Sequence, residues 1–406
     1  MYPSRKNNDQ KWGNTNTLRP WFGASITAAV LGLVSQNASA QFYAQSNLVS
    51  DVPGMAAFTD TNLAGAWGTI HSSTSPWWVN TTASGLSLLF NGEGQPLPIV
   101  VAIPPTNPAT ATGIAFNGGT GFEVASNLPA VFIFATLNGT ISGWNPHQTN
   151  PQLAVLKVDN EGSAQYSGVA LAQRNGQDTL YAANLGQNRI DVFDSGFKPV
   201  TLPASAFTDA NVSAGLTVFN VFNINGALVV TYAPTNALQG PGPNQAGQGF
   251  VDIYDANGVL QATLESGSWM NSPWGVALAP EGFGKPNRNL LIGMFGSGNI
   301  AAFDTKHGHF RGLLKGTDGQ SITLMGKGLW GLGFGNGSAA GSVNSLYFAT
   351  DFVTAGHFHG LFGTLTRVED QDRDEGENQQ DKHNRNQGGN EDGGDEGHDG
   401  GRGGDR

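Results

Sequence analysis

A chain of 406 residues with no cysteine and a formal net charge of −11 can form no disulfide and carries no lipid on a cysteine. Residues 369–406 alone hold thirteen acidic and five basic side chains, and residues 41–368 hold seventeen and eleven. So sparse and mildly acidic a surface has no basic patch to displace counterions from a nucleic acid, which excludes nucleic-acid binding.

Residues 1–40 have the pattern of an export signal. Four basic side chains, the last of them Arg19, precede an apolar segment at residues 21–34, and Ala38-Ser39-Ala40 follows as a cleavage motif. Cleavage would leave Gln41 as the first residue of a secreted or periplasmic protein. A retained membrane anchor is the alternative, but the apolar segment is shorter than the roughly twenty residues that cross a bilayer. We expect no membrane span after cleavage.

Residues 41–368 contain an internal repeat. A glycine within a short alternating strand is followed, some residues later, by a second strand rich in aromatic and aliphatic residues. The first strands contain Trp67-Gly68-Thr69-Ile70, Thr112-Gly113-Ile114-Ala115, Ser167-Gly168-Val169-Ala170, Pro273-Trp274-Gly275-Val276 and Leu329-Trp330-Gly331-Leu332. Further strands follow in each unit, as residues 189–194 and 198–202 do in the third.

The spacing of the repeat predicts the number of units. Gly168 and Gly275 are 107 residues apart, about twice the 55 and 56 residues between neighbouring units elsewhere, and residues 218–255 supply a degraded sixth unit. Units of about fifty residues with four short strands are typical of propeller blades, so the sequence predicts an all-β, six-bladed β-propeller at residues 41–368. A double β-sandwich is the alternative, but it does not explain the repeated glycine.

Three segments complete this prediction. Residues 42–49 are expected to add an outer strand to the last blade and so close the ring. Residues 234–249, rich in Pro, Gly, Asn and Gln, are expected to form a mobile loop. Residues 369–406 have no large apolar side chain and are expected to be a disordered acidic tail, which serves solubility or binds calcium loosely.

Two resemblances support this fold. Residues 184–194, with the turn Asn188-Arg189-Ile190, resemble the blade core of NHL-repeat propellers. The chain also resembles a family of uncharacterised exported bacterial proteins predicted to be six-bladed propellers. This likeness rests on residues 59–63, 85–92, 249–255, 328–337 and 359–363. The family resemblance implies a fold and no activity, because the function of that family is unassigned.

The residues just before each repeat glycine are the first candidates for a site, because propeller sites lie at the ends of the central channel. These positions hold Trp67, Thr112, Ser167, Trp274 and Trp330. Calcium-dependent, lactonase-like propellers use carboxylates and amides there to hold the cation, so the lack of a carboxylate argues against such chemistry. The three tryptophans are candidates for stacking on a sugar or another flat ligand, with packing between blades as the alternative.

Polar side chains near the ends of second strands form another candidate group. Asn80, Asn184 and Asp351 are expected either to surround one mouth of the channel or to cap the turns that follow. His357 and His359 are weak metal-ligand candidates, because a His-x-His pair on a strand points both rings to one face. No third ligand can be located from the sequence.

The sequence therefore favours a non-catalytic binding or protein-interaction module that works as a monomer with an unidentified protein or carbohydrate ligand. No catalytic residue and no cofactor is predicted, with calcium the one cofactor considered. The alternative is a hydrolase or lyase that acts on a sugar or lactone at the channel mouth.

Overall fold

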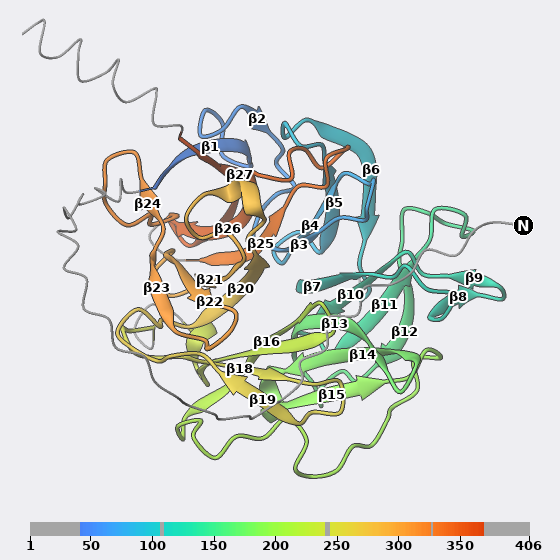
Figure 1. Ribbon diagram of the computed structural model, residues 1–406. Coiled ribbons are helices and arrows are strands. Elements are labelled where there is room, and N and C mark those ends of the chain that lie inside the picture. Colours follow the sequence, from blue (N-terminus) through green and yellow to red (C-terminus); the bar gives the residue numbers. More distant parts are fainter. Residues whose placement is uncertain (1–40, 106–108, 240–243, 326–327, 369–406) are drawn as a thin grey trace, which may run out of the picture. The chain divides into compact units, whose positions relative to one another are not determined.

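The computed structural model describes residues 41–105, 109–239, 244–325 and 328–368. The predicted export signal, the predicted acidic tail and residues 240–243 of the predicted loop lie outside these residues. Within the described ranges, no helix is long and apolar enough to cross a membrane. The described chain is all-β and forms a six-bladed propeller (Figure 1).

Six antiparallel sheets follow one another along the chain (Figure 1). Blade 1 contains β3 (Ala66–Ile70), β4 (Trp77–Thr81), β5 (Leu86–Phe90) and β6 (Pro96–Ala102), and blade 2 contains β7 (Ala111–Phe116), β10 (Phe132–Thr136), β11 (Thr140–Trp144) and β12 (Val155–Asp159). Blade 3 contains β13 (Tyr166–Arg174), β14 (Gln177–Asn184) and β15 (Arg189–Phe193), and blade 4 contains β16 (Leu216–Ile224), β17 (Ala227–Pro234), β18 (Phe250–Tyr254) and β19 (Leu260–Thr263). Blade 5 contains β20 (Pro273–Leu278), β21 (Asn289–Met294), β22 (Ile300–Asp304) and β23 (Phe310–Leu313), and blade 6 contains β25 (Leu329–Phe334), β26 (Leu346–Thr354), β27 (His357–Arg367) and β1 (Phe42–Ser50). The predicted number of blades is confirmed.

The first strand of each blade is the innermost, and these six strands contact one another in a ring. The contacts run in the order β3, β7, β13, β16, β20, β25 and back to β3. A Cβ on Gly113 would lie 2.6 Å from the backbone nitrogen of Val169 and 2.7 Å from the Cα of Gly168. The innermost strands therefore approach so closely that only glycine fits, which explains the repeat.

Blade 4 lacks this glycine, and the structure shows what replaces it. Asn220 of β16 faces Gly168 and donates a hydrogen bond from Nδ2 to the carbonyl oxygen of Trp274, 2.8 Å away in blade 5. The amide group thus fills the extra space and joins two blades. The substitution accounts for the degraded sequence pattern of the sixth unit.

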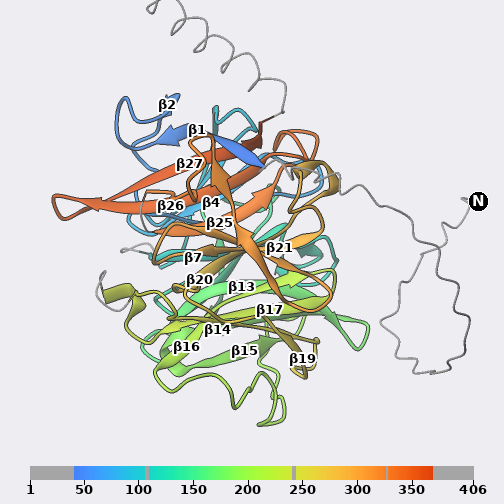
Figure 2. The ribbon, with the colours of Figure 1, turned by 60° about the vertical axis from the view of Figure 1, so that its left-hand side comes forward.

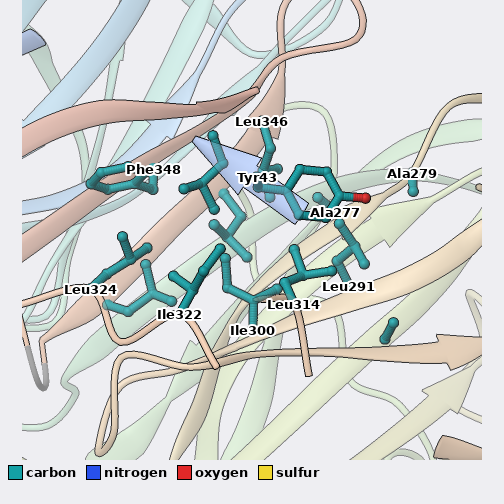
Figure 3. Packing of buried hydrophobic residues seen from close by; sticks show 14 of the residues in the cluster. Tyr43, Ala277, Ala279, Leu291, Ile300, Leu314, Ile322, Leu324, Leu346 and Phe348 are labelled. Atoms are coloured by element: carbon teal, nitrogen blue, oxygen red, sulfur yellow. The ribbon is translucent and has the colours of Figure 1, made fainter. Parts of the chain in front are cut away.

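Each blade buries its two faces against its two neighbours. Successive side chains of a strand point to opposite faces, so Trp77 belongs to the cluster between blades 6 and 1, whereas Trp78 belongs to the cluster between blades 1 and 2. Figure 3 shows the cluster between blades 5 and 6, where Tyr43 of β1 lies among Leu291 and Leu346. No blade could bury its apolar faces alone, so the ring is the folding unit.

The predicted closure of the ring is confirmed. β1 pairs antiparallel with β27, and the blue and red ends of the described chain lie side by side in Figure 2. Short strands β2 (Phe58–Thr59) and β24 (Lys315–Gly316) pair with β1 on its other side. After β1, the carboxylate of Asp51 accepts hydrogen bonds from the backbone nitrogen of Gly360 (2.8 Å) and contacts Nδ1 of His359 (2.7 Å). These bonds fix the end of β1 to blade 6.

Three local features differ from the sequence prediction. The fourth strand expected at residues 198–202 is reduced to a bridge between Phe193 and Pro199, because a proline has no N–H to continue the pairing. Blade 2 carries an unpredicted hairpin of β8 (Glu123–Ala125) and β9 (Leu128–Pro129). In the loop predicted at 234–249, Ala237 is buried against the aromatic residues of the channel.

Candidate functional site

The three tryptophans at the strand openings gather at one end of the central channel. Trp67 and Trp330 stack with ring centroids 3.4 Å apart, and Trp274 meets both of them edge-on at 6.2 and 5.7 Å. All three are at least 95% buried. Phe219, at the corresponding position of blade 4, packs 5.6 Å from Trp330 and completes what we term the aromatic plug: Trp67, Phe219, Trp274 and Trp330.

Hydrogen bonds hold the remaining two openings. Thr112 donates from Oγ1 to the carbonyl oxygen of Tyr166 at 2.6 Å, and Trp274 donates from Nε1 to the carbonyl oxygen of Ser167 at 3.2 Å. The indole N–H groups of Trp67 and Trp330 are buried without a partner in the described chain. The plug therefore seals this end of the channel by apolar contact and presents no indole face to solvent.

Asn80, Asn184 and Asp351 lie near this end but at different register positions. Asn80 precedes the residue that pairs with Ala66, Asn184 pairs directly with Tyr166, and Asp351 follows the residue that pairs with Leu329. Because neighbouring residues of a strand point to opposite faces, the three side chains do not form one ring.

Each of these side chains or its backbone is bound within the protein. Asn80 donates from Nδ2 to the carbonyl oxygens of Thr112 and Gly113, both at 3.1 Å. Asn184 accepts from the backbone nitrogen of Gln165 at 3.2 Å and donates to Asp191 at 2.8 Å. Asp351 donates from its backbone nitrogen to the carbonyl oxygen of Gly328 at 2.9 Å. The two asparagines thus join neighbouring segments of the ring.

The two histidines that are weak metal-ligand candidates have different surroundings. His359 pairs with Asp51 and stacks on Phe352, whereas His357 is exposed near the tip of the β26–β27 hairpin. In the described part of the chain, no group of three His, Cys, Asp or Glu side chains is arranged to hold a metal ion.

The opposite end of the channel is hollow and apolar. The innermost strands begin at the plug and end here, and the last residues of β3, β16, β20 and β25 border the opening, which we term the channel mouth. It forms a cavity of about 230 Å³. Its lining is formed by Thr69, Ile70, His71, Trp77, Phe222, Ile224, Val276, Ala277, Leu278, Leu332, Gly333 and Phe334.

Between the mouth and the plug the channel is nearly filled. The remaining space is about 10 Å³, room for one water molecule at most. Thr69, Phe222, Val276 and Leu332 line both this space and the mouth. Thr69 is 94% buried, and its hydroxyl oxygen has no hydrogen-bond partner within the described residues. A buried hydroxyl without a partner is costly, and Thr69 is one of several side chains in the described part of the chain whose buried polar atom has none.

His71 forms the polar part of the rim. Its Nδ1 lies 2.7 Å from the carbonyl oxygen of Ser72 and its Nε2 lies 2.6 Å from that of Phe334 in blade 6. The ring also meets Trp77 edge-on at 4.5 Å. Both ring nitrogens contact carbonyl oxygens, and the contact of Nε2 with Phe334 links blades 1 and 6 at the mouth.

A buried carboxyl group lies apart from the channel, in blade 4. Asp252 accepts hydrogen bonds from Thr263 (2.7 Å) and Tyr254 (3.0 Å), and Tyr254 is in turn 2.9 Å from the hydroxyl of Tyr232. Burial raises the pKa of Asp252 from 3.8 to about 6, against the opposing effect of these two donors. Burial also raises the pKa of Tyr254 and of Tyr232.

Comparisons with known proteins identify the fold but no activity. No family model matches the chain. It is similar to two uncharacterized proteins of Acanthamoeba polyphaga mimivirus: R640, 32% identical over 212 residues (50% of this chain, 38% of R640), and R648, 28% identical over 297 residues (69% and 71%). Thus the chain spans little more than a third of R640. Among solved structures, a protein of unknown function from Bacteroides thetaiotaomicron is 9% identical, with a TM-score of 0.50 over 80% of this chain and 76% of that one.

The sequence marks the three tryptophans of the plug as candidate site residues, but it does not mark Phe219, the mouth or Asp252 in this way. The mouth is built from the last residues of strands whose first residues drew attention, and ordinary apolar residues such as Ile224 and Leu278 carry no motif. Asp252 did carry a signal. It is two residues from Tyr254 on a strand, so the two side chains share a face, and Tyr254 is fully buried.

The buried carboxyl group makes stability depend on pH. The folded state binds an extra proton between the pKa of the unfolded group, 3.8, and the folded value of about 6, so stability falls as pH rises through this range. We expect the free energy of unfolding of the wild type to fall by on the order of 2 kcal/mol between pH 4 and 7, and we expect Asp252→Asn to lack this fall. Denaturant unfolding from pH 4 to 7 measures this, with Asp159→Asn, at an exposed strand end, as control. Parallel pH profiles for the wild type and Asp252→Asn would contradict the prediction.

Proposed function

We propose that the protein is an exported, non-catalytic binding module that takes a compact apolar molecule at the channel mouth. The observation that carries the proposal is a cavity of about 230 Å³ lined mostly by apolar side chains, behind which the channel is nearly filled. Concave, preformed, mostly apolar cavities with few polar groups are the usual form of small-molecule sites. The export signal and the likeness to exported bacterial propellers, both read from sequence, belong to this proposal.

The chemistry of the lining supports binding rather than turnover. Among the described residues of the mouth, His71 is the one side chain with an acid–base group, and both of its ring nitrogens contact backbone carbonyl oxygens. General acid–base catalysis needs a group free to exchange a proton with the substrate. Among the described residues that line the mouth, no side chain is free in this way, which favours binding over hydrolysis or lysis of a sugar or lactone.

The same lining favours an apolar ligand over a carbohydrate. A sugar would bring many hydroxyl groups into a cavity where Thr69 and His71 are the described polar side chains, and each unpaired hydroxyl would cost binding energy. The tryptophans that suggested sugar stacking are buried in the plug at the other end. A protein partner would need to insert a side chain into the ring.

Blocking the mouth should abolish binding. We expect Ile224→Trp to weaken the binding of cyclohexanone and methylcyclohexane at least about tenfold, because the larger ring fills the cavity. Isothermal titration calorimetry on the chain from Gln41 measures this. Ile99→Trp is the matched control, since Ile99 is exposed on the outer strand β6. Equal affinities for Ile224→Trp and Ile99→Trp would refute a ligand site at the mouth.

Export is tested separately. When the full chain is expressed in a Gram-negative bacterium, we expect the mature protein in the periplasm or the medium, with Gln41 as its N-terminal residue by Edman sequencing. A full-length chain in the membrane fraction would support the anchor instead.

A further inference from the structure

We infer that Thr69 is the polar anchor of the channel mouth, so that the site selects compact apolar molecules with one carbonyl oxygen. This inference rests on the proposed binding function and specifies its ligand. The class comprises small cyclic ketones and similar molecules in which a hydrocarbon body carries a single hydrogen-bond acceptor.

The position of Thr69 is suited to this role. It follows Trp67 of the plug along β3 and precedes His71 at the rim. The Thr69 side chain borders both the mouth and the narrow space behind it, together with Phe222, Val276 and Leu332. A ligand that fills the mouth therefore brings its inner end to this residue.

The other polar groups nearby are already bound or belong elsewhere. Asn220, also at the channel, donates from Nδ2 to the carbonyl oxygen of Trp274 and accepts at Oδ1 from the backbone nitrogen of Val221, each at 2.8 Å. The unpartnered indole N–H groups of Trp67 and Trp330 lie in the plug. Of the described side chains that line both spaces, Thr69 is the one with an unsatisfied polar atom.

The missing partner is an acceptor. A hydroxyl has one donor hydrogen and two acceptor lone pairs, and a buried donor without a partner is rarer and less tolerated than an unused lone pair. The space behind Thr69 admits at most one water molecule, and Asn220, the other polar side chain that lines it, already has hydrogen-bond partners at Nδ2 and Oδ1. A carbonyl oxygen satisfies the O–H group and brings no donor of its own that would remain unpaired.

A pair of matched probes tests the inference. Cyclohexanone and methylcyclohexane have the same ring and the same number of heavy atoms, and only the ketone accepts a hydrogen bond. We expect calorimetry on the chain from Gln41 to show that the affinity for cyclohexanone relative to methylcyclohexane is about tenfold higher in the wild type than in Thr69→Val, the effect of one buried hydrogen bond. Thr69→Val keeps the shape and removes the hydroxyl, so it should lose this preference and leave methylcyclohexane binding unchanged or tighter. Thr69→Ser should retain the preference and guards against misfolding of the valine variant.

The outcomes separate this inference from the proposed function. An unchanged ratio of the two affinities in Thr69→Val would overturn the role of Thr69 and leave the mouth as a binding site. Failure of the wild type to bind either probe at millimolar concentration would overturn the site and the inference together.

Discussion

Val49→Asp should destabilise the protein more than any exposed substitution on the same strand. Val49 is fully buried in β1, opposite Phe362 of β27, in the cluster between blades 6 and 1. An aspartate there would be an unpaired buried charge, with an expected cost of about 3–5 kcal/mol. Because β1 closes the ring, we expect unfolding in urea to shift to much lower concentration in a single transition.

The matched control for this experiment lies on the same strand. Ser46→Asp introduces the same charge at an exposed position opposite Thr364, so its effect should stay within about 0.5 kcal/mol. If both variants unfold at the wild-type urea concentration, β1 does not contribute to the closure of the ring in solution.

Trp330→Ala should cost about 3–5 kcal/mol, the usual range for removing a large aromatic side chain from a core. Trp330 is 1% exposed and lies at the centre of the plug, where its ring contacts Trp67, Phe219 and Phe295 at centroid distances of 3.4, 5.6 and 4.2 Å. Its loss would leave a cavity where aromatic residues of blades 1, 4, 5 and 6 meet. Thermal unfolding followed by circular dichroism measures the change.

Two further variants make the interpretation specific. Trp330→Phe keeps most of the ring contacts and removes an indole N–H that has no partner, so it should cost much less than the alanine variant. Phe358→Ala removes an aromatic ring that is 54% exposed and should be nearly neutral. Equal losses for Trp330→Ala and Phe358→Ala would show that the plug does not stabilise the ring.

The repeat made the fold predictable from sequence because the same short motif occurs in five of the six blades. Gly113 and Gly275 are required by the close approach of neighbouring inner strands, so the spacing of the glycines counts the blades. The sixth unit was found from the interval between Gly168 and Gly275, although Asn220 stands at its glycine position. The repeat predicts a fourth strand in blade 3, but Pro199 has no N–H to donate. The predicted strand is therefore reduced to a single bridge.

The candidate site was less predictable, because it depends on which residues meet across the ring. The sequence marked Trp67, Trp274 and Trp330, but their burial follows from contacts among three blades far apart in sequence. Thr69 was visible only as part of a strand motif. Thr69 is a candidate because its buried hydroxyl has no hydrogen-bond partner among the described residues, and a pattern of residue types does not show which hydrogen bonds form.

The pairing of β1 with β27 brings the two ends of the folded region together. The backbone nitrogen of Val368 donates to the carbonyl oxygen of Phe42 at 3.0 Å, so the covalent break in the circle falls between two residues that are hydrogen-bonded neighbours. The two ends of the folded region are therefore adjacent in the strand pairing, and the ring of blades has no first or last blade in space. If the folded region instead began and ended at a loop between two other blades, every interstrand hydrogen bond could be retained. The blade that comes first along the chain is therefore independent of how the blades pack.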